Sequence, residues 1–156
     1  MTALKTSHDT IVVTRAYDAE AKRVFAAWAD SAALGRWYLP GDANWVSRVV
    51  AHEFRVGGRK HLTFGPKGGP LYSEDCRYED IVENWRLCFS MTIARDDVRI
   101  TTSMVTVEMI PAGERTRVKV TDQCCTLDGG DTSADRERGW GETLDKLPAE
   151  LARGRS

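Results

Sequence analysis

The sequence predicts an α+β fold in which one curved, seven-stranded antiparallel sheet wraps around a long C-terminal helix. Hydrophobic residues alternate with a period of two through most of the segment from Trp45 to Cys125, and they recur at helical spacing before and after it. The turns between the alternating runs are too short for parallel crossovers, so neighbouring strands are expected to be antiparallel. The apolar face of such a sheet needs a cover, and the C-terminal segment is the only long amphipathic helix that the sequence offers.

The N-terminal part is expected to contain one strand and two short helices. Thr10–Tyr17 is rich in β-branched side chains, which favours a strand. Asp18 can cap a helix over Ala19–Ala29. Asp30 or Ser31 can cap a second, shorter helix. The apolar residues at helical spacing in these two helices are Ala21, Val24, Phe25, Trp28, Leu34, Trp37 and Tyr38.

Six further strands are expected in a meander. The segments between them are rich in glycine, proline, asparagine and aspartate, a composition typical of hairpin turns. The expected strands are Trp45–Phe54, Lys60–Phe64, Leu71–Ile81, Trp85–Ile93, Val98–Met109 and Thr116–Cys125.

A long helix is expected after residue 130, with Asp131, Thr132 or Ser133 as its N-cap. Pro148 cannot donate a hydrogen bond and is expected to kink or end this helix. The apolar stripe of the helix comprises Trp140, Leu144, Leu147 and Leu151.

Two glycines flank Trp140 inside the same helix. Each glycine costs a helix about 1 kcal/mol relative to alanine. We therefore expect another element to pack closely against the helix at both Gly139 and Gly141.

Length and charge indicate one globular domain over residues 1–156, with flexible ends at about 1–9 and 152–156. A chain of 156 residues can bury roughly 70% of the surface that its unfolded form exposes. The 22 basic and 23 acidic residues nearly cancel, which argues against nucleic acid as a partner. No apolar run reaches the roughly 18 residues of a spanning helix, and the first ten residues lack a secretory apolar region. We expect a cytoplasmic protein that does not insert into membranes.

The four cysteines show no C-x-x-C spacing, and the three histidines add no zinc-like pattern. In a reducing compartment these thiols are expected to pack as small hydrophobic groups. We therefore expect no metal and no cofactor. The residues are Cys76, Cys88, Cys124, Cys125, His8, His52 and His61.

Several motifs in combination resemble one known family over about residues 10 to 151. They are Arg15–Ala19 with Val24, Trp28, Asp30, Leu34 and Trp37; Glu53–Gly58; Gly65–Gly69; Tyr78–Ile81 with Arg86 and Leu87; and Gly139 and Trp140 with Leu144 and Leu147. The chain is similar to the START-like (SRPBCC) superfamily. Within it, the chain resembles homologues of the activator of the heat-shock-protein-90 ATPase, of the C-terminal-domain type.

The resemblance implies the helix-grip fold. The superfamily includes lipid carriers, plant hormone receptors, pollen allergens, aromatic polyketide cyclases and oxygenase subunits, so the fold alone does not select a function. The family name adds a chaperone-associated role in the stress response as an alternative, with a chaperone or a second copy of the chain as partner.

A curved sheet cannot meet a helix along its whole length, so a ligand cavity is expected between the two. The expected ligand is a small hydrophobic or aromatic molecule. Aromatic rings supply flat surfaces, phenols supply polar groups, and methionine adapts to irregular shapes. The expected ligand-binding residues are Trp37, Tyr38, Val50, His52, Phe64, Tyr72, Tyr78, Phe89, Met104, Trp140 and Leu144.

His52 leaves an enzymatic alternative open. Counting by twos from Val50 places His52 on the inward face of its strand. A neutral imidazole there could act as a general acid or base. With Tyr78 or Tyr72 it would move protons in a cyclase- or hydro-lyase-type enzyme. No nucleophile can be placed near His52 from the sequence, so the sequence favours a binding protein.

Charged residues on the strands are expected to face solvent. Adjacent acidic residues such as Glu74 and Asp75 point to opposite faces of a strand, which does not suit a two-carboxylate site. A basic stretch around one hairpin is interpreted as a solvated surface. It contains Arg55, Arg59, Lys60, His61 and Lys67.

Overall fold

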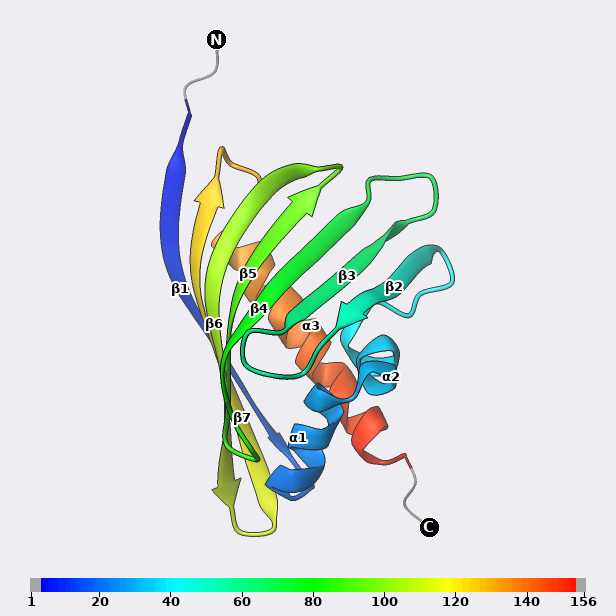
Figure 1. Cartoon of the computed structure of the whole chain (residues 1–156), viewed down its shortest axis with the longest axis vertical. Coiled ribbons are helices and arrows are strands. Elements are labelled where there is room, and N and C mark those ends of the chain that lie inside the picture. The colour runs from blue at the N-terminus through cyan, green and yellow to red at the C-terminus, as the bar shows by residue number, and fades with distance from the viewer. Residues whose placement is uncertain (1–3, 154–156) are drawn as a thin grey trace.

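In the computed structural model, which describes residues 4–153, seven strands form one curved antiparallel sheet in the order β1-β7-β6-β5-β4-β3-β2 (Figure 1). The predicted helix-grip fold is confirmed, because the long C-terminal helix α3 runs diagonally across this sheet. The strands are β1 (Thr6–Tyr17), β2 (Trp45–His52), β3 (Arg59–Pro66), β4 (Tyr72–Val82), β5 (Arg86–Arg95), β6 (Val98–Ala112) and β7 (Arg115–Leu127).

The first strand is longer than expected. β1 begins at Thr6, and Thr6 to Asp9 pair with β7. The N-terminal segment expected to be flexible therefore ends earlier than residue 9. Residues 1–3 and 154–156, which belong to the two expected flexible ends, lie outside the described residues.

The helices between β1 and β2 are α1 (Ala21–Ala29), α2 (Ser31–Ala33) and the π-helical turn η1 (Leu34–Tyr38). α1 begins two residues later than predicted, with Glu20 rather than Asp18 as its N-cap. Asp30 caps α2 as predicted, because its carboxylate accepts a hydrogen bond from the amide of Ala33 at 3.1 Å.

A β-bulge in β2 changes which side chains face the helix. The register with β3 shifts between Val49 and Ala51, which leaves Val50 unpaired. Beyond the bulge, His52 pairs with Lys60 and shares its inward face. Val50 is 44% exposed. The expectation that both residues face inward is therefore right for His52 and wrong for Val50.

The helix α3 (Ser133–Leu151) begins after Thr132, whose hydroxyl accepts a hydrogen bond from the amide of Asp135 at 3.1 Å. Near the other end, Arg36 from η1 donates two hydrogen bonds to the buried carboxylate of Glu150, at 2.9 and 2.6 Å. Arg36 raises the stability of the charged form of Glu150 and lowers its pKa. The contact holds the C-terminal end of α3 beside the short helices (Figure 1).

Pro148 does not end α3, which continues to Leu151. A proline at this position leaves the carbonyl of Leu144 without its helical donor. The hydroxyl of Tyr17 on β1 donates to that carbonyl at 2.7 Å. The hydrogen bond lost inside the helix is thus replaced from the sheet, which explains why the expected break is absent.

The two glycines of α3 differ in how closely other residues approach them. A Cβ atom on Gly141 would lie 2.9 Å from the guanidinium of Arg15, so the predicted close approach is confirmed there. A Cβ atom on Gly139 would meet nothing within 4 Å. The prediction of close packing at Gly139 is wrong, and the space beside it belongs to a cavity described below.

The hydrophobic core lies between the sheet and the C-terminal half of α3, where the short helices also pack (Figure 1). Trp28 and Trp37 meet edge to face at 4.9 Å between ring centroids. Leu144 and Leu147 of α3 are fully buried in the same cluster. This end of the space under the helix is therefore filled with side chains.

We predict that Tyr17→Phe lowers the free energy of unfolding by about 1–3 kcal/mol, since it leaves the buried carbonyl of Leu144 without a donor. In a Pro148→Ala background the loss should shrink, because an amide N–H at position 148 can then donate to Leu144. Urea denaturation of the wild type, Tyr17→Phe, Pro148→Ala and the double variant measures how far the loss depends on Pro148. Tyr72→Phe is the control, since the Tyr72 hydroxyl makes no hydrogen bond within residues 4–153; equal losses in both backgrounds would contradict the account.

Candidate functional site

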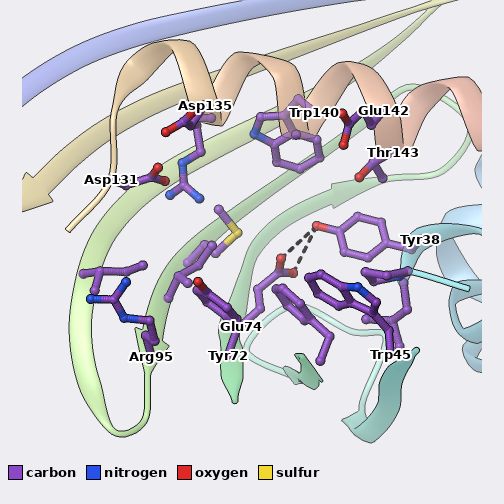
Figure 2. A pocket seen from close by; sticks show the side chains of 18 of the residues that line it. Tyr38, Trp45, Tyr72, Glu74, Arg95, Asp131, Asp135, Trp140, Glu142 and Thr143 are labelled. Carbon is purple, nitrogen blue, oxygen red and sulfur yellow. Dashed lines mark hydrogen bonds between the residues drawn. The ribbon is translucent and has the colours of Figure 1, made fainter. Parts of the chain in front are cut away.

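A cavity of about 860 Å³ lies between α3 and the inner face of β3, β4 and β5 (Figure 2). Five aromatic side chains line it. The apolar part of the lining is completed by Met91, Ile93 and Ile100. The aromatic residues are Tyr38, Trp45, Phe64, Tyr72 and Trp140.

The five aromatic residues reach the cavity from five different elements: η1, β2, β3, β4 and α3. Phe64 on β3 pairs with Tyr72 on β4, and their rings stack at 5.7 Å with an interplanar angle of 8°. Tyr38 ends η1, and its ring meets the edge of Trp140 at 6.2 Å. Figure 2 shows Trp140 reaching down from α3 while Tyr72 and Trp45 lie on the opposite side. The cavity is thus enclosed by rings above and below.

A buried ion pair contributes to the floor of the cavity. The ammonium of Lys60 lies 3.3 Å from the carboxylate of Glu74, and the two residues are 1% and 5% exposed. Tyr38 donates its hydroxyl to Glu74 at 3.0 Å, and the thiol of Cys76 donates at 3.6 Å. The ammonium also faces the ring of Phe89 at 4.2 Å. Glu74 lines the cavity, whereas Lys60 does not.

The surroundings of this pair hold its groups in definite protonation states. Burial disfavours the charge on Lys60, but Tyr38, Cys76 and Glu74 outweigh burial and raise the pKa of Lys60 well above its ordinary value. Burial, and then the charge of Glu74, raises the pKa of Tyr38 well above its ordinary value. Lys60 therefore stays protonated and is not a nucleophile, and Tyr38 stays a hydrogen-bond donor.

A second buried ion pair joins α3 to the sheet. The Nε atom of Arg136 lies 3.4 Å from the fully buried Asp122 on β7. Trp140, one helical turn after Arg136, donates its indole N–H to the same carboxylate at 2.9 Å. Arg136 also donates to Thr101 at 2.6 Å and to Ser103 at 3.2 Å. Arg136 and Trp140 both line the cavity.

The rim of the cavity is polar. Lys146 donates to the backbone carbonyl of Leu39 at 3.0 Å and so connects α3 to the segment before β2. Burial lowers the pKa of Lys146, and the nearby charges of Asp42 and Glu142 oppose that effect. The other charged residues of the rim are Arg95, Asp131 and Asp135.

The comparisons with known proteins agree with this architecture. A family model described as "Activator of Hsp90 ATPase homolog 1-like protein" matches residues 18–152. The chain belongs to this family. Among proteins with curated descriptions, none matches the chain.

Solved structures resemble this member of the Activator of Hsp90 ATPase homolog 1-like family along most of its length. A protein from Rhizobium loti is 36% identical, with a TM-score of 0.85 over 94% of this chain and 99% of that one. A protein from Rhizobium leguminosarum is 29% identical, with a TM-score of 0.86 over 97% and 99% of the two chains. A protein of the dynemicin biosynthetic locus, at 19% identity and a TM-score of 0.69, shares the fold over 94% of this chain and 48% of its own.

Four of the residues expected to bind a ligand line the cavity: Tyr38, Phe64, Tyr72 and Trp140. Each combines an inward-facing position with a place near the N-terminal half of α3. Whether they contact a ligand remains a prediction.

Three other candidates lie in the filled core instead. Trp37 is 2% exposed and donates its indole N–H to the carbonyl of Ala27 at 2.9 Å. Phe89 and Leu144 are fully buried and do not line the cavity. Trp37 packs against Trp28 and Tyr38. Phe89 contacts Tyr78 and the ammonium of Lys60.

Val50 and Met104 face away from the cavity. Val50 is turned outward by the bulge in β2. Met104 is 37% exposed and alternates with the fully buried Val105, so it lies on the outer face of β6. The expectation that these two residues line the pocket is wrong.

His52 and Tyr78 contact each other outside the cavity lining. The Nε2 atom of His52 lies 2.8 Å from the hydroxyl of Tyr78, and its Nδ1 atom lies 2.9 Å from the hydroxyl of Ser31. Both ring nitrogens are therefore engaged. This geometry contradicts the enzymatic alternative in which His52 and Tyr78 or Tyr72 move protons at a ligand in the cavity.

The sequence reasoning missed the charged residues of the site. Lys60 and Glu74 were expected at the surface, yet both are buried. The alternation could have located them, since Glu74 lies between Tyr72 and Cys76 in the same parity. Arg136 precedes Trp140 by four residues and so extends the apolar stripe of α3.

Within residues 4–153, no helix is long and apolar enough to cross a membrane. In the same part of the chain, no group of three His, Cys, Asp or Glu side chains is placed to hold a metal ion.

We predict that Lys60→Met lowers the free energy of unfolding by about 3–5 kcal/mol, because it leaves the buried Glu74 carboxylate without its cation. Adding Glu74→Gln should restore most of the loss. Arg59→Met, which removes an exposed ion pair with Asp75 on the same two strands, should cost less than about 1 kcal/mol. Chemical denaturation measures all three, and a double variant no more stable than Lys60→Met would contradict the pairing.

We also predict a pH dependence that comes from His52. Burial, and then the charge of Lys60, lowers the pKa of His52 from 6.5 to about 4. The unfolded chain therefore binds a proton that the folded protein excludes between these values, and stability falls as the pH decreases from 6.5 to about 4. The slope stays below about 1.4 kcal/mol per pH unit, because the two states differ by at most one proton on this ring.

Urea denaturation at several pH values tests this dependence. His52→Gln should flatten the stability profile in that window, and the same substitution at the exposed His8 is the control. Parallel profiles for the wild type and His52→Gln would show that another group is responsible.

Proposed function

We propose that the protein binds a small hydrophobic or aromatic molecule in the cavity between the sheet and α3. The proposal rests on a cavity of about 860 Å³ lined by five aromatic rings. Ligand pockets typically enclose roughly 300–1,000 Å³ and combine an apolar lining with a few polar groups. Both the size and the lining fit that description.

The contacts around the cavity support a preformed space. The polar contacts of Arg136 and Trp140 with Asp122 hold α3 above the sheet at one end. Lys146 connects the helix to the segment before β2 at another point. No side chain fills the space beside Gly139. A preformed pocket reduces the ordering cost of binding.

Family membership is compatible with this role, since the superfamily that the chain resembles includes lipid carriers and hormone receptors. Association with a chaperone rests on the family description alone. The cavity favours ligand binding, because a protein-docking role does not require a hollow lined by five aromatic rings.

We predict that Gly139→Phe abolishes ligand binding without unfolding the protein. Gly139 lines the cavity, and a side chain there meets no atom within 4 Å at its Cβ position, so a phenyl ring would enter the cavity. Glycine is the poorest helix former after proline, and replacing it with phenylalanine gains about 0.5 kcal/mol of helix propensity, so the variant should be at least as stable as the wild type. Thermal unfolding and ligand screening by native mass spectrometry measure the two effects.

Glu137→Phe is the matched control, because Glu137 is exposed on the same helix and does not line the cavity. It should bind as the wild type does. The quenching of tryptophan fluorescence by bound ligand provides a second readout, since Trp45 and Trp140 line the cavity. The proposed function fails if a broad screen and exposure to cell extract yield no molecule that Gly139→Phe excludes.

A further inference from the structure

Arg136 lines the cavity with hydrogen-bonding capacity that the protein does not use. The residue is 8% exposed. Its Nη2 atom donates to Thr101 and Ser103, but its Nε atom has no hydrogen-bond partner. Among residues 4–153, no group accepts a hydrogen bond from Nη1. The Nε atom is fully enclosed and faces Asp122, so Nη1 is the guanidinium atom of Arg136 that keeps a free donor at the wall of the aromatic cavity.

A second guanidinium lies at the same end of the cavity. Ile93 pairs with Thr101, the residue that accepts from Arg136, and Arg95 follows two residues later on the same face of β5. Two residues of a strand span about 7 Å. Figure 2 shows Arg95 beside Tyr72, at the end of the cavity where Asp131 and Asp135 also lie. In the part of the chain that the structure describes, Arg95 forms no ion pair.

Two of the acidic residues that line the cavity are already paired with cations other than Arg136 and Arg95. Glu74 is neutralised by Lys60 and already accepts from Tyr38. Asp135 pairs with Arg138 outside the cavity. The remaining ones, Asp42, Asp131 and Glu142, lie on the same rim as the exposed Arg95, where water and salt screen acidic and basic groups alike.

Asp122 lies behind Arg136 and balances its charge, as Glu74 does for Lys60. Nη1 of Arg136 still has a donor that Asp122 does not reach. The exposed Arg95 forms no ion pair within residues 4–153. The charge of Arg95 and the free Nη1 donor of Arg136 together therefore favour an anion at this end of the cavity.

We propose that the ligand is a small aromatic anion, a carboxylate or sulfonate, whose acidic group binds between Arg136 and Arg95 while its rings pack among Trp45, Tyr72 and Trp140. This inference rests on the proposed ligand-binding function and names the chemical class of the ligand. Guanidinium groups recognise the oxygens of carboxylates and sulfonates through charge-assisted N–H donors, and the free Nη1 of Arg136 supplies such donors in a low-dielectric setting.

Two fluorescent dyes with the same ring system test the proposal. 8-Anilinonaphthalene-1-sulfonate carries a sulfonate, and N-phenyl-1-naphthylamine lacks it. The wild-type protein should bind the anionic dye at least about 10-fold more tightly than the neutral one, the effect of a charge-assisted hydrogen bond. Gly139→Phe should abolish the binding of both dyes, which shows that they occupy the cavity.

Arginine variants assign the effect to residues. Arg95→Gln should weaken binding of the anionic dye about 2- to 5-fold, because Arg95 is exposed, and leave the neutral dye unchanged. Arg99→Gln removes the same charge from an exposed residue outside the lining and is the control. Because loss of Arg136 alone would leave Asp122 buried and unpaired, the variants for that position are Arg136→Lys and the double variant Arg136→Gln/Asp122→Asn. Both should lose the preference for the anion while keeping the circular dichroism spectrum of the wild type.

The outcomes separate this inference from the proposed function. If both dyes bind equally and Gly139→Phe excludes both, the cavity binds apolar molecules and the anion proposal is wrong. If the preference for the anion persists in Arg95→Gln and in both Arg136 variants, the site lies elsewhere and the proposal is again wrong. If neither dye binds, or if Gly139→Phe does not affect binding, the result counts against the proposed function itself.

Discussion

A fully buried carboxylate, Asp122 on β7, determines where α3 lies on the sheet. Such a group is tolerated only if a counter-charge or a donor reaches it, and both come from α3: the guanidinium of Arg136 pairs with it, and Trp140 donates its indole N–H. The two residues are one helical turn apart on the same face. Together they fix the rotation of α3 about its axis and its distance from the sheet. Because this contact is made to β7, near one edge of the sheet, the space between the helix and β3, β4 and β5 is left for the cavity.

The fold could be predicted because its determinants are local in sequence. The alternation of apolar and polar residues located the strands, and the turn residues between them indicated where each strand ends. The structure departs from the prediction where a contact between residues distant in the sequence replaces a local one. Pro148 removes a helical hydrogen bond, but Tyr17 supplies a substitute from a residue far away in the sequence. The bulge at Val50 is likewise invisible in an alternating pattern, since it depends on how β2 aligns with β3.

The candidate site could be predicted only in part, for a related reason. Parity shows which face of the sheet a side chain occupies, but not how far along α3 it lies. Phe64 and Phe89 both face the helix, yet Phe64 lines the cavity and Phe89 lies in the filled core. Lys60 and Glu74 were assigned to the surface by residue type, although alternation places both inward. A buried pair of opposite charges is recognised only when both strands are aligned with each other.

The two buried ion pairs differ in a way that matters for recognition. Glu74 accepts from Tyr38 and Cys76 and pairs with Lys60, so its capacity is filled by the protein. Arg136 pairs with Asp122 through Nε and, within residues 4–153, keeps its Nη1 donors free. Water entering the empty cavity can satisfy those donors, and a ligand that displaces the water must replace its hydrogen bonds or lose affinity. A purely apolar molecule would leave the guanidinium unsatisfied, whereas a molecule with an oxyanion at one end would not. The free hydrogen-bond donors therefore lie at one end of the cavity, near the start of α3. A ligand with one polar end and one apolar end would bind in a single orientation.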